Sequence, residues 1–195
     1  MAKEINGVPF TLGNSKLPKT TAIFNMGTAT GCPSRTLGLC QCPDKCYAMK
    51  AERQYKDTLA FRERQAGVFG FMSAKQIADA IIAGSTKKCP IKQFRFSESG
   101  DFRDQAAVNK MTAICAILKE AKIKCYGYTA RKDLKFNKLM EVANVQGSGF
   151  MVSNNFKFIP KGGSTEGCDK VCKGDCTKCS LCWKATGLVI GVNQH

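Results

Sequence analysis

Cysteine spacing is the feature that most constrains this chain, because five of its twelve cysteines fall in one short segment, GCDKVCKGDCTKCSLCW. They are Cys168, Cys172, Cys176, Cys179 and Cys182. The last four are spaced C-x3-C-x2-C-x2-C, the reverse of the bacterial ferredoxin order, and such short spacings let one loop hold the corners of a cubane. A structural zinc site usually has separated cysteine pairs, so the continuous run favours iron–sulfur over zinc. The fifth thiol is then a spare or a ligand of another cluster.

A second group of thiols, in GCPSRTLGLCQCPDKCYAMK, directly follows a predicted strand, where α/β folds place ligands. Cys40 and Cys42 are separated by one residue, which makes joint ligation of one compact site awkward. We therefore expect Cys32, Cys40 and Cys46 to be the main ligands, with Cys42 as fourth ligand or neighbour. Three protein ligands would leave one iron open, so this group is the predicted reactive site. Reduced cysteines in an ordinary loop are the alternative.

Length and composition predict one domain, because 195 residues with 44% hydrophobic content suffice for a single sizeable core. We expect an α/β iron–sulfur domain over 1–195, with a cysteine-rich segment at about 160–184. The N-terminal residues lack a signal-peptide pattern and no run reaches membrane-spanning length, so a cytoplasmic location with reduced thiols is expected. The single histidine is His195, the last residue, which excludes histidine-based triads.

The formal charge of +15 is spread along the chain instead of forming one basic arm. This distribution allows weak, sequence-independent binding of nucleic acid. A small-molecule substrate or a redox partner is the main expectation, and no membrane partner is predicted. The oligomeric state stays open.

Apolar patterns alternate between short strand-like runs and helical ones, which is typical of βαβ units. Isolated Cys89, Cys115 and Cys125 are expected to pack in the core. Strands are predicted at 20–27, 92–97, 123–128, 150–153 and 188–192, and helices at 47–69, 73–84, 108–118 and 133–142. The result is an α/β fold with a largely parallel sheet or partial (βα) barrel, whose functional loops lie at the carboxyl ends of the strands. Residues 160–184 lack any apolar period, so something other than a core must hold them.

A charged turn, Glu98-Ser99-Gly100-Asp101, ends the second of these strands. An ordinary turn followed by a helix cap is one interpretation of it. The other is a ligand site, in which Arg95, Glu98 and Asp101 are the candidate catalytic residues. Further residues reach the neighbouring strand end and are expected to face the same pocket: Tyr126, Tyr128, Thr129 and Arg131. The candidate cofactor-binding set is Glu98, Gly100, Tyr128 and Arg131.

Several sequence blocks together resemble the phage gene-product-88-like family of small cysteine-rich proteins. They are GNSKLPKTTAIFNM, CPSRT with Cys40, CYAMKAE, FRFSESGDF and YGYTAR, in order between about residues 12 and 155. The resemblance implies a bacteriophage protein that acts in the cytoplasm of an infected bacterial host, and it says little about reaction chemistry. Cys42 is an addition to the family pattern.

A looser similarity is to radical S-adenosylmethionine enzymes, where a three-cysteine loop after the first strand holds a cluster. A Gly/Glu motif after the second strand holds the methionine part of the cofactor there. The similarity implies the first role for the Cys32, Cys40 and Cys46 loop, and the second for the turn with Glu98, Gly100 and Asp101. The usual C-x3-C-x2-C spacing is absent from the first loop and occurs only at Cys172, Cys176 and Cys179.

Three functional classes follow. The first is an enzyme with one or two [4Fe-4S] clusters, one of them open, that performs redox, radical S-adenosylmethionine-like or thiol chemistry. The second is a ferredoxin-like electron carrier, and the third is a nucleic-acid-binding protein with structural clusters. A carrier needs little beyond a cluster shell, so the additional α/β domain favours the enzyme, with S-adenosylmethionine as an optional cofactor.

Overall fold

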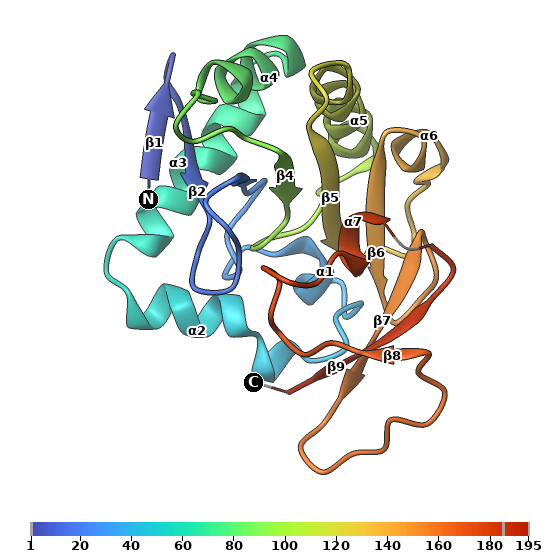
Figure 1. Cartoon of the computed structure of the whole chain (residues 1–195). Helices are drawn as coiled ribbons and strands as arrows, with labels where there is room; N and C mark the ends of the chain where they lie inside the picture. The colour runs from blue at the N-terminus through green and yellow to red at the C-terminus, as the bar shows by residue number, and fades with distance from the viewer. Residues whose placement is uncertain (1, 185, 195) are drawn as a thin grey trace.

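A nine-stranded sheet forms the centre of the protein, in the computed structural model that describes residues 2–184 and 186–194 (Figure 1). His195 lies outside the described residues. The strand order is β1-β2-β3-β4-β5-β6-β7-β9-β8. The parallel strands are β3 (Thr21–Phe24), β4 (Gln93–Phe96), β5 (Lys124–Thr129), β6 (Ala143–Ser148), β7 (Asn154–Ile159), β9 (Val189–Asn193) and β8 (Lys170–Val171). The predicted α/β class with a largely parallel sheet is confirmed.

An antiparallel hairpin, β1 (Ala2–Ile5) and β2 (Val8–Leu12), extends the sheet at one edge and was not among the predicted strands. Its turn is Asn6-Gly7, and both residues have positive φ, 50° and 77°. This conformation matches the right-handed twist of the two strands and suits Asn-Gly.

Helices pack on one face of the sheet and share a single hydrophobic core with it. Ser73 starts α4 (Ala74–Ala83) with a capping box and Gly84 ends it, as predicted. The apolar face predicted for the next helix is buried in α5 (Gln105–Glu120), at Val108, Met111, Cys115 and Leu118.

Three predicted elements were wrong. The helix expected at 47–69 is two helices, α2 (Tyr47–Gln54) and α3 (Thr58–Phe71), because Tyr55 has extended backbone angles. The helix expected at 133–142 shrinks to α6 (Asn137–Met140). The strand expected at 150–153 is a loop, whose Phe150 and Val152 pack against the core without joining the sheet. The fourth strand of the parallel set is instead β6, whose sequence ANVQGS is too polar to stand out.

The second face of the sheet carries different side chains, since successive strand residues point to opposite faces. On β5, Cys125 lies against Cys115 of α5, whereas Tyr126 stacks near Trp183 on the opposite side. The cysteine-rich segment, residues 160–184, covers this second face and includes only two short regular elements, β8 and α7 (Leu181–Lys184). Among the described residues, no helix is long and apolar enough to cross a membrane.

Candidate metal centres

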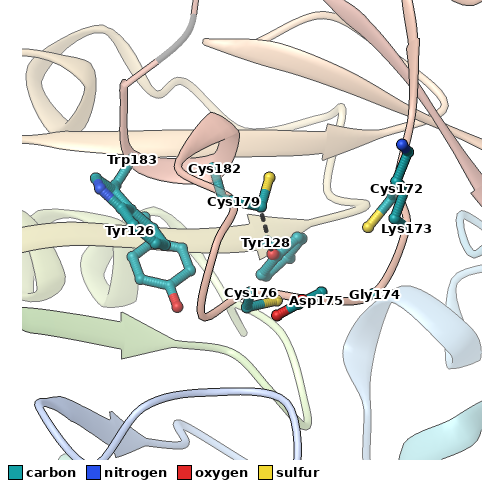
Figure 2. A pocket seen from close by; sticks show the side chains of 10 residues that line it. All are labelled: Tyr126, Tyr128, Cys172, Lys173, Gly174, Asp175, Cys176, Cys179, Cys182 and Trp183. Atoms are coloured by element: carbon teal, nitrogen blue, oxygen red, sulfur yellow. Dashed lines mark hydrogen bonds between the residues drawn. The ribbon is translucent and has the colours of Figure 1, made fainter.

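The cysteine-rich segment brings four of its five thiols to one pocket on the second face of the sheet. Figure 2 shows them placed around the Tyr128 ring, with Tyr126 and Trp183 on one side. Cys168 is not among the lining residues, because its sulfur packs against Gly191 of β9. The four that line the pocket are Cys172, Cys176, Cys179 and Cys182.

Polar side chains of the sheet fasten this segment in place. The Tyr128 hydroxyl donates to Sγ of Cys182 at 3.2 Å, and Nε2 of Gln146 donates to the Cys182 carbonyl at 2.9 Å. The rings of Tyr126 and Trp183 lie 5.6 Å apart between centroids. The pocket therefore has a fixed wall, made by β5 and β6, beneath a segment with little regular structure.

Arg95 of β4 places a positive charge under the same pocket. Its guanidinium lies 4.9 Å from the centre of the Tyr128 ring and 3.7 Å from Oε1 of Glu98. Burial lowers the pKa of Arg95, but nearby Tyr47, Tyr128 and Glu98 outweigh burial and raise it above the ordinary value, so the charge persists. Two buried polar atoms here, Nε of Arg95 and the Tyr126 hydroxyl, have no hydrogen-bond partner among the described residues.

Two of these thiols, Cys176 and Cys182, hold their protons more tightly than an ordinary cysteine does. Burial raises the pKa of Cys182 to about 11 and also raises that of Cys176, although the Arg95 charge offsets part of both shifts. A bound metal must displace these protons, because thiolates and not thiols are ligands. Arg95 would then stand opposite the negative charge that four thiolates bring.

The four thiols of this pocket are not gathered around a point where one metal ion could bind. No three His, Cys, Asp or Glu side chains in the described part of the chain lie close enough to share one metal ion. Tetrahedral zinc with Zn–S bonds of about 2.3 Å would hold sulfurs only about 3.8 Å apart. A cubane instead takes each thiolate at a different corner and accepts hydrogen bonds at its sulfurs. The unpaired Tyr126 hydroxyl supplies a donor of the kind that such a group needs.

The first cysteine group lies in a long loop that crosses the carboxyl ends of several strands. Its short elements are α1 (Pro33–Thr36), after Cys32, and the 3-10 turn η1 (Pro43–Lys45), after Cys42. Ser34 donates to Oδ2 of Asp101 at 2.5 Å, beyond β4. Gln41 donates to the Ser148 hydroxyl at the end of β6, at 2.8 Å. The loop is therefore fixed to the strand-end edge where the sequence predicts a site.

Within this loop, Cys40 and Cys42 act on each other directly. The Cys42 thiol donates to Cys40, which lowers the pKa of Cys40 to about 6, and the same contact raises the pKa of Cys42. Burial raises the pKa of Cys32 to about 11, and Cys40 adds to that shift. Cys46 likewise adds to the pKa of Cys42, so all four thiols are electrostatic neighbours. Within the Cys40–Cys42 pair, Cys40 is therefore the thiol that loses its proton more readily.

Residues of the charged turn are divided between the two cysteine groups. Asp101 is buried beside the first group and accepts from the Ala130 amide at 2.7 Å, and burial raises its pKa. Glu98 accepts from Nδ2 of Asn14 at 2.7 Å and lies near Arg95. Gly100 has φ of +70°, and a Cβ there would meet the backbone of Gly27 at 2.6 Å, so its close approach needs glycine.

Arg131 is engaged elsewhere. Its guanidinium pairs with Asp133 at 2.7 Å and donates to the carbonyls of Phe102 and Arg103. These contacts hold the loop after β4 against the loop after β5. Thr129 donates a side-chain hydrogen bond to Asp101 and does not line the cysteine pocket. Of the residues expected to share one pocket, Tyr126 and Tyr128 line the cysteine pocket, and Arg95 reaches it from below.

A buried polar network behind both loops was missed by the sequence reasoning. Glu52 accepts from the amides of Ala29 and Thr30, at 2.7 and 3.0 Å, and pairs with Arg62 at 2.9 Å. Gln65 accepts from Nδ2 of Asn25 at 2.9 Å. No sequence signal marks this network, because the helix is interrupted at Tyr55 without a proline or glycine at the break, and its polar residues resemble those of an exposed helix.

Comparison with known proteins identifies a family. The model of the family described as Gene product 88 matches residues 3–158, which include the hairpin, the first cysteine group and the charged turn but not the C-terminal cysteines. No curated protein and no solved structure matches this chain. Because the family model covers well over half of the sequence, the chain belongs to the Gene product 88 family.

Proposed function

We propose that this protein is an iron–sulfur protein whose C-terminal thiols, Cys172, Cys176, Cys179 and Cys182, hold a [4Fe-4S] cluster. The observation that carries the proposal is the convergence of four cysteines, spaced for a cubane, on one pocket. The pocket also contains an unpaired buried hydroxyl, that of Tyr126, and a nearby cation, Arg95. Hydrogen bonds and positive charge near the sulfurs are the means by which proteins stabilise a reduced cluster.

A second cluster is proposed at Cys32, Cys40 and Cys46, with Cys42 as neighbour or fourth ligand. Support comes from the position of this loop at the carboxyl ends of the parallel strands, where such folds bind ligands. An iron with an open position would bind a thiol, a carboxylate or the amino-carboxylate of S-adenosylmethionine. Asp101 accepts a hydrogen bond from Ser34, which follows Cys32 closely in the chain, and so fixes the segment that carries Cys32.

The loop and the pocket are joined by Tyr47, which follows Cys46 directly. Its hydroxyl donates to the Glu98 carbonyl at 2.7 Å and accepts from Nη2 of Arg95 at 3.3 Å. A separate electron carrier would not need this link between a surface cluster and a charged strand-end turn. This connection favours an enzyme, in which the C-terminal cluster is structural or relays electrons to the first one.

The test is anaerobic purification after growth with iron, followed by analysis of iron, acid-labile sulfide and zinc. We expect a brown protein with broad absorption near roughly 400 nm that bleaches on reduction. Cys176→Ser and Cys40→Ser should each remove about one cluster, and Cys89→Ser is the matched control because Cys89 lies outside both groups. Stoichiometric zinc without sulfide would refute the proposal.

Reactivity is tested separately. Electron paramagnetic resonance of the reduced protein should change when S-adenosylmethionine or a small thiol is added, and Cys40→Ser should abolish that change while Cys176→Ser leaves it. If the wild-type spectrum responds to neither ligand, and all cluster irons prove to have four protein or sulfide ligands, the enzyme proposal fails and electron transfer is the better description.

A further inference from the structure

An open groove runs beside the first cysteine group, along the length of α2 and the turn before it. Four of its lining side chains are cationic, and one is acidic. The acidic one is Asp44, and the cations are Arg35, Lys45, Lys50 and Arg53. The groove therefore has a local formal charge of +3 in a protein whose overall charge is +15.

These cations are not neutralised by the protein itself. None of the four forms an ion pair within the described residues. The nearest acidic residue of α2 along the chain, Glu52, is buried and paired with Arg62. Four unpaired cations facing one open groove provide a favourable potential for a polyanion.

The cations form a row instead of a cage. Lys50 and Arg53 are three residues apart on one side of α2, and Lys45 precedes the helix, whose eight residues make it about 12 Å long. Phosphates on one strand of a double helix repeat at about 3.4 Å along the axis and lie further apart in an extended single strand, so a row of this length still spans more than one phosphate. A single phosphate would need donors that converge on one point.

Exposed tyrosines lie at the ends of the same helix. Tyr47 lines the groove and is 48% exposed, although its hydroxyl is hydrogen bonded, and Tyr55 follows the helix and is 58% exposed. Both rings are therefore accessible to a ligand. Bases of a single strand stack on such rings, whatever their sequence, while cations follow the backbone.

We infer that the groove of Arg35, Lys45, Lys50 and Arg53 binds single-stranded nucleic acid through its backbone, with Tyr55 as a stacking platform. Binding is independent of base sequence, because the groove is open and has no enclosed pocket for a base. This inference does not depend on metal, and it places the groove next to the proposed reactive cluster. A nucleic-acid strand bound there would lie across the first cysteine loop.

The test is fluorescence anisotropy with a labelled oligothymidylate at several salt concentrations. The triple variant Lys45→Gln/Lys50→Gln/Arg53→Gln should weaken binding at least tenfold and make the salt slope shallower by about two, given about 0.7 per phosphate contact. Tyr55→Ala should weaken binding by about tenfold at unchanged salt slope. The control triple, Lys87→Gln/Lys88→Gln/Lys124→Gln, removes equal charge from exposed positions near the opposite ends of the strands.

Equal losses in the two triple variants would overturn the inference, since binding would then follow net charge alone. If polyglutamate displaces the labelled strand as effectively as unlabelled oligonucleotide does, the inference is overturned in favour of an acidic protein partner. The absence of wild-type binding at low salt would also overturn it. Circular dichroism of each variant ensures that a lost interaction is not lost folding.

Discussion

Replacing Arg62 with methionine should destabilise the protein by about 3 kcal/mol, because it leaves the Glu52 carboxylate buried without its partner. The side chains of Arg62 and Glu52 are only 7% and 3% exposed, so neither ion can be hydrated in the folded protein. The change also removes the bond from Arg62 to the Ala48 carbonyl, at 2.9 Å. Breaking this buried pair should therefore cost more stability than breaking a pair on the surface.

The size of the effect follows from what remains around the carboxylate. Breaking a buried pair costs about 3–5 kcal/mol. Glu52 would still accept from the Ala29 amide, the Thr30 amide and hydroxyl, and the Ser99 hydroxyl, which keeps the cost near the lower limit. A loss of about 3 kcal/mol is more than a hundredfold in the unfolding equilibrium. At an m value of about 2 kcal/mol/M, the urea midpoint falls by about 1.5 M.

Urea unfolding, monitored by circular dichroism, measures the shift of the midpoint, with all variants at the same iron content. The double variant Glu52→Gln/Arg62→Met contains no buried charge and should be more stable than Arg62→Met alone. The matched control is Lys75→Met, which breaks an exposed pair with Asp79 and should cost less than about 1 kcal/mol. If Arg62→Met costs no more than Lys75→Met, or the double variant is the least stable, the argument from burial is wrong.

Three further outcomes are expected. Burial raises the pKa of Glu52, but its hydrogen bonds outweigh burial and leave that pKa below the ordinary value, so its stabilisation is complete above about pH 4.3 and is lost as pH falls. Urea midpoints from pH 7 to pH 3 should therefore fall more in wild type than in Glu52→Gln. Gly127→Ala should cost about 1–3 kcal/mol in urea unfolding, because its Cβ would stand 2.1 Å from the Phe96 ring. Cys176→Ser should make the cysteine-rich segment sensitive to protease, whereas Cys89→Ser should not.

Sequence reasoning located four of the seven parallel strands, β3, β4, β5 and β9, because their apolar runs are short and bounded by polar turns, and it missed β6, β7 and β8. Its weakest area was the N-terminal hairpin, although Asn6-Gly7 is a strong turn signal, since polar residues of β1 leave only β2 clearly apolar. The interruption of the predicted long helix at Tyr55 was also hidden. No proline or glycine marks it, and the polar residues that it buries resemble those of an exposed helix.

The sequence predicted where the candidate sites lie along the chain better than it predicted which residues contact one another there. The spacing of the cysteines indicated two groups, and the structure places each group in one region. The sequence did not indicate that Arg95 lies nearer the C-terminal cysteine group than the first one. It also did not indicate that Arg131 holds two loops together. Those relations depend on which face of a strand a residue occupies and on side-chain reach, which chain order does not specify.

The second face of the sheet explains why the C-terminal cysteines belong with this fold. A sheet residue such as Phe94 contributes to the helical core, while its neighbour Arg95 must be covered from the other side. A segment with an apolar stripe would cover Tyr126 and Tyr128 but would add no negative charge on that side of Arg95, which pairs with Glu98 at 3.7 Å. The cysteine-rich segment has no such stripe, and it offers thiols instead. Four thiolates on a cluster would add negative charge on the pocket side of Arg95, so the proposed metal would help to cover the second face of the sheet as well as order the segment.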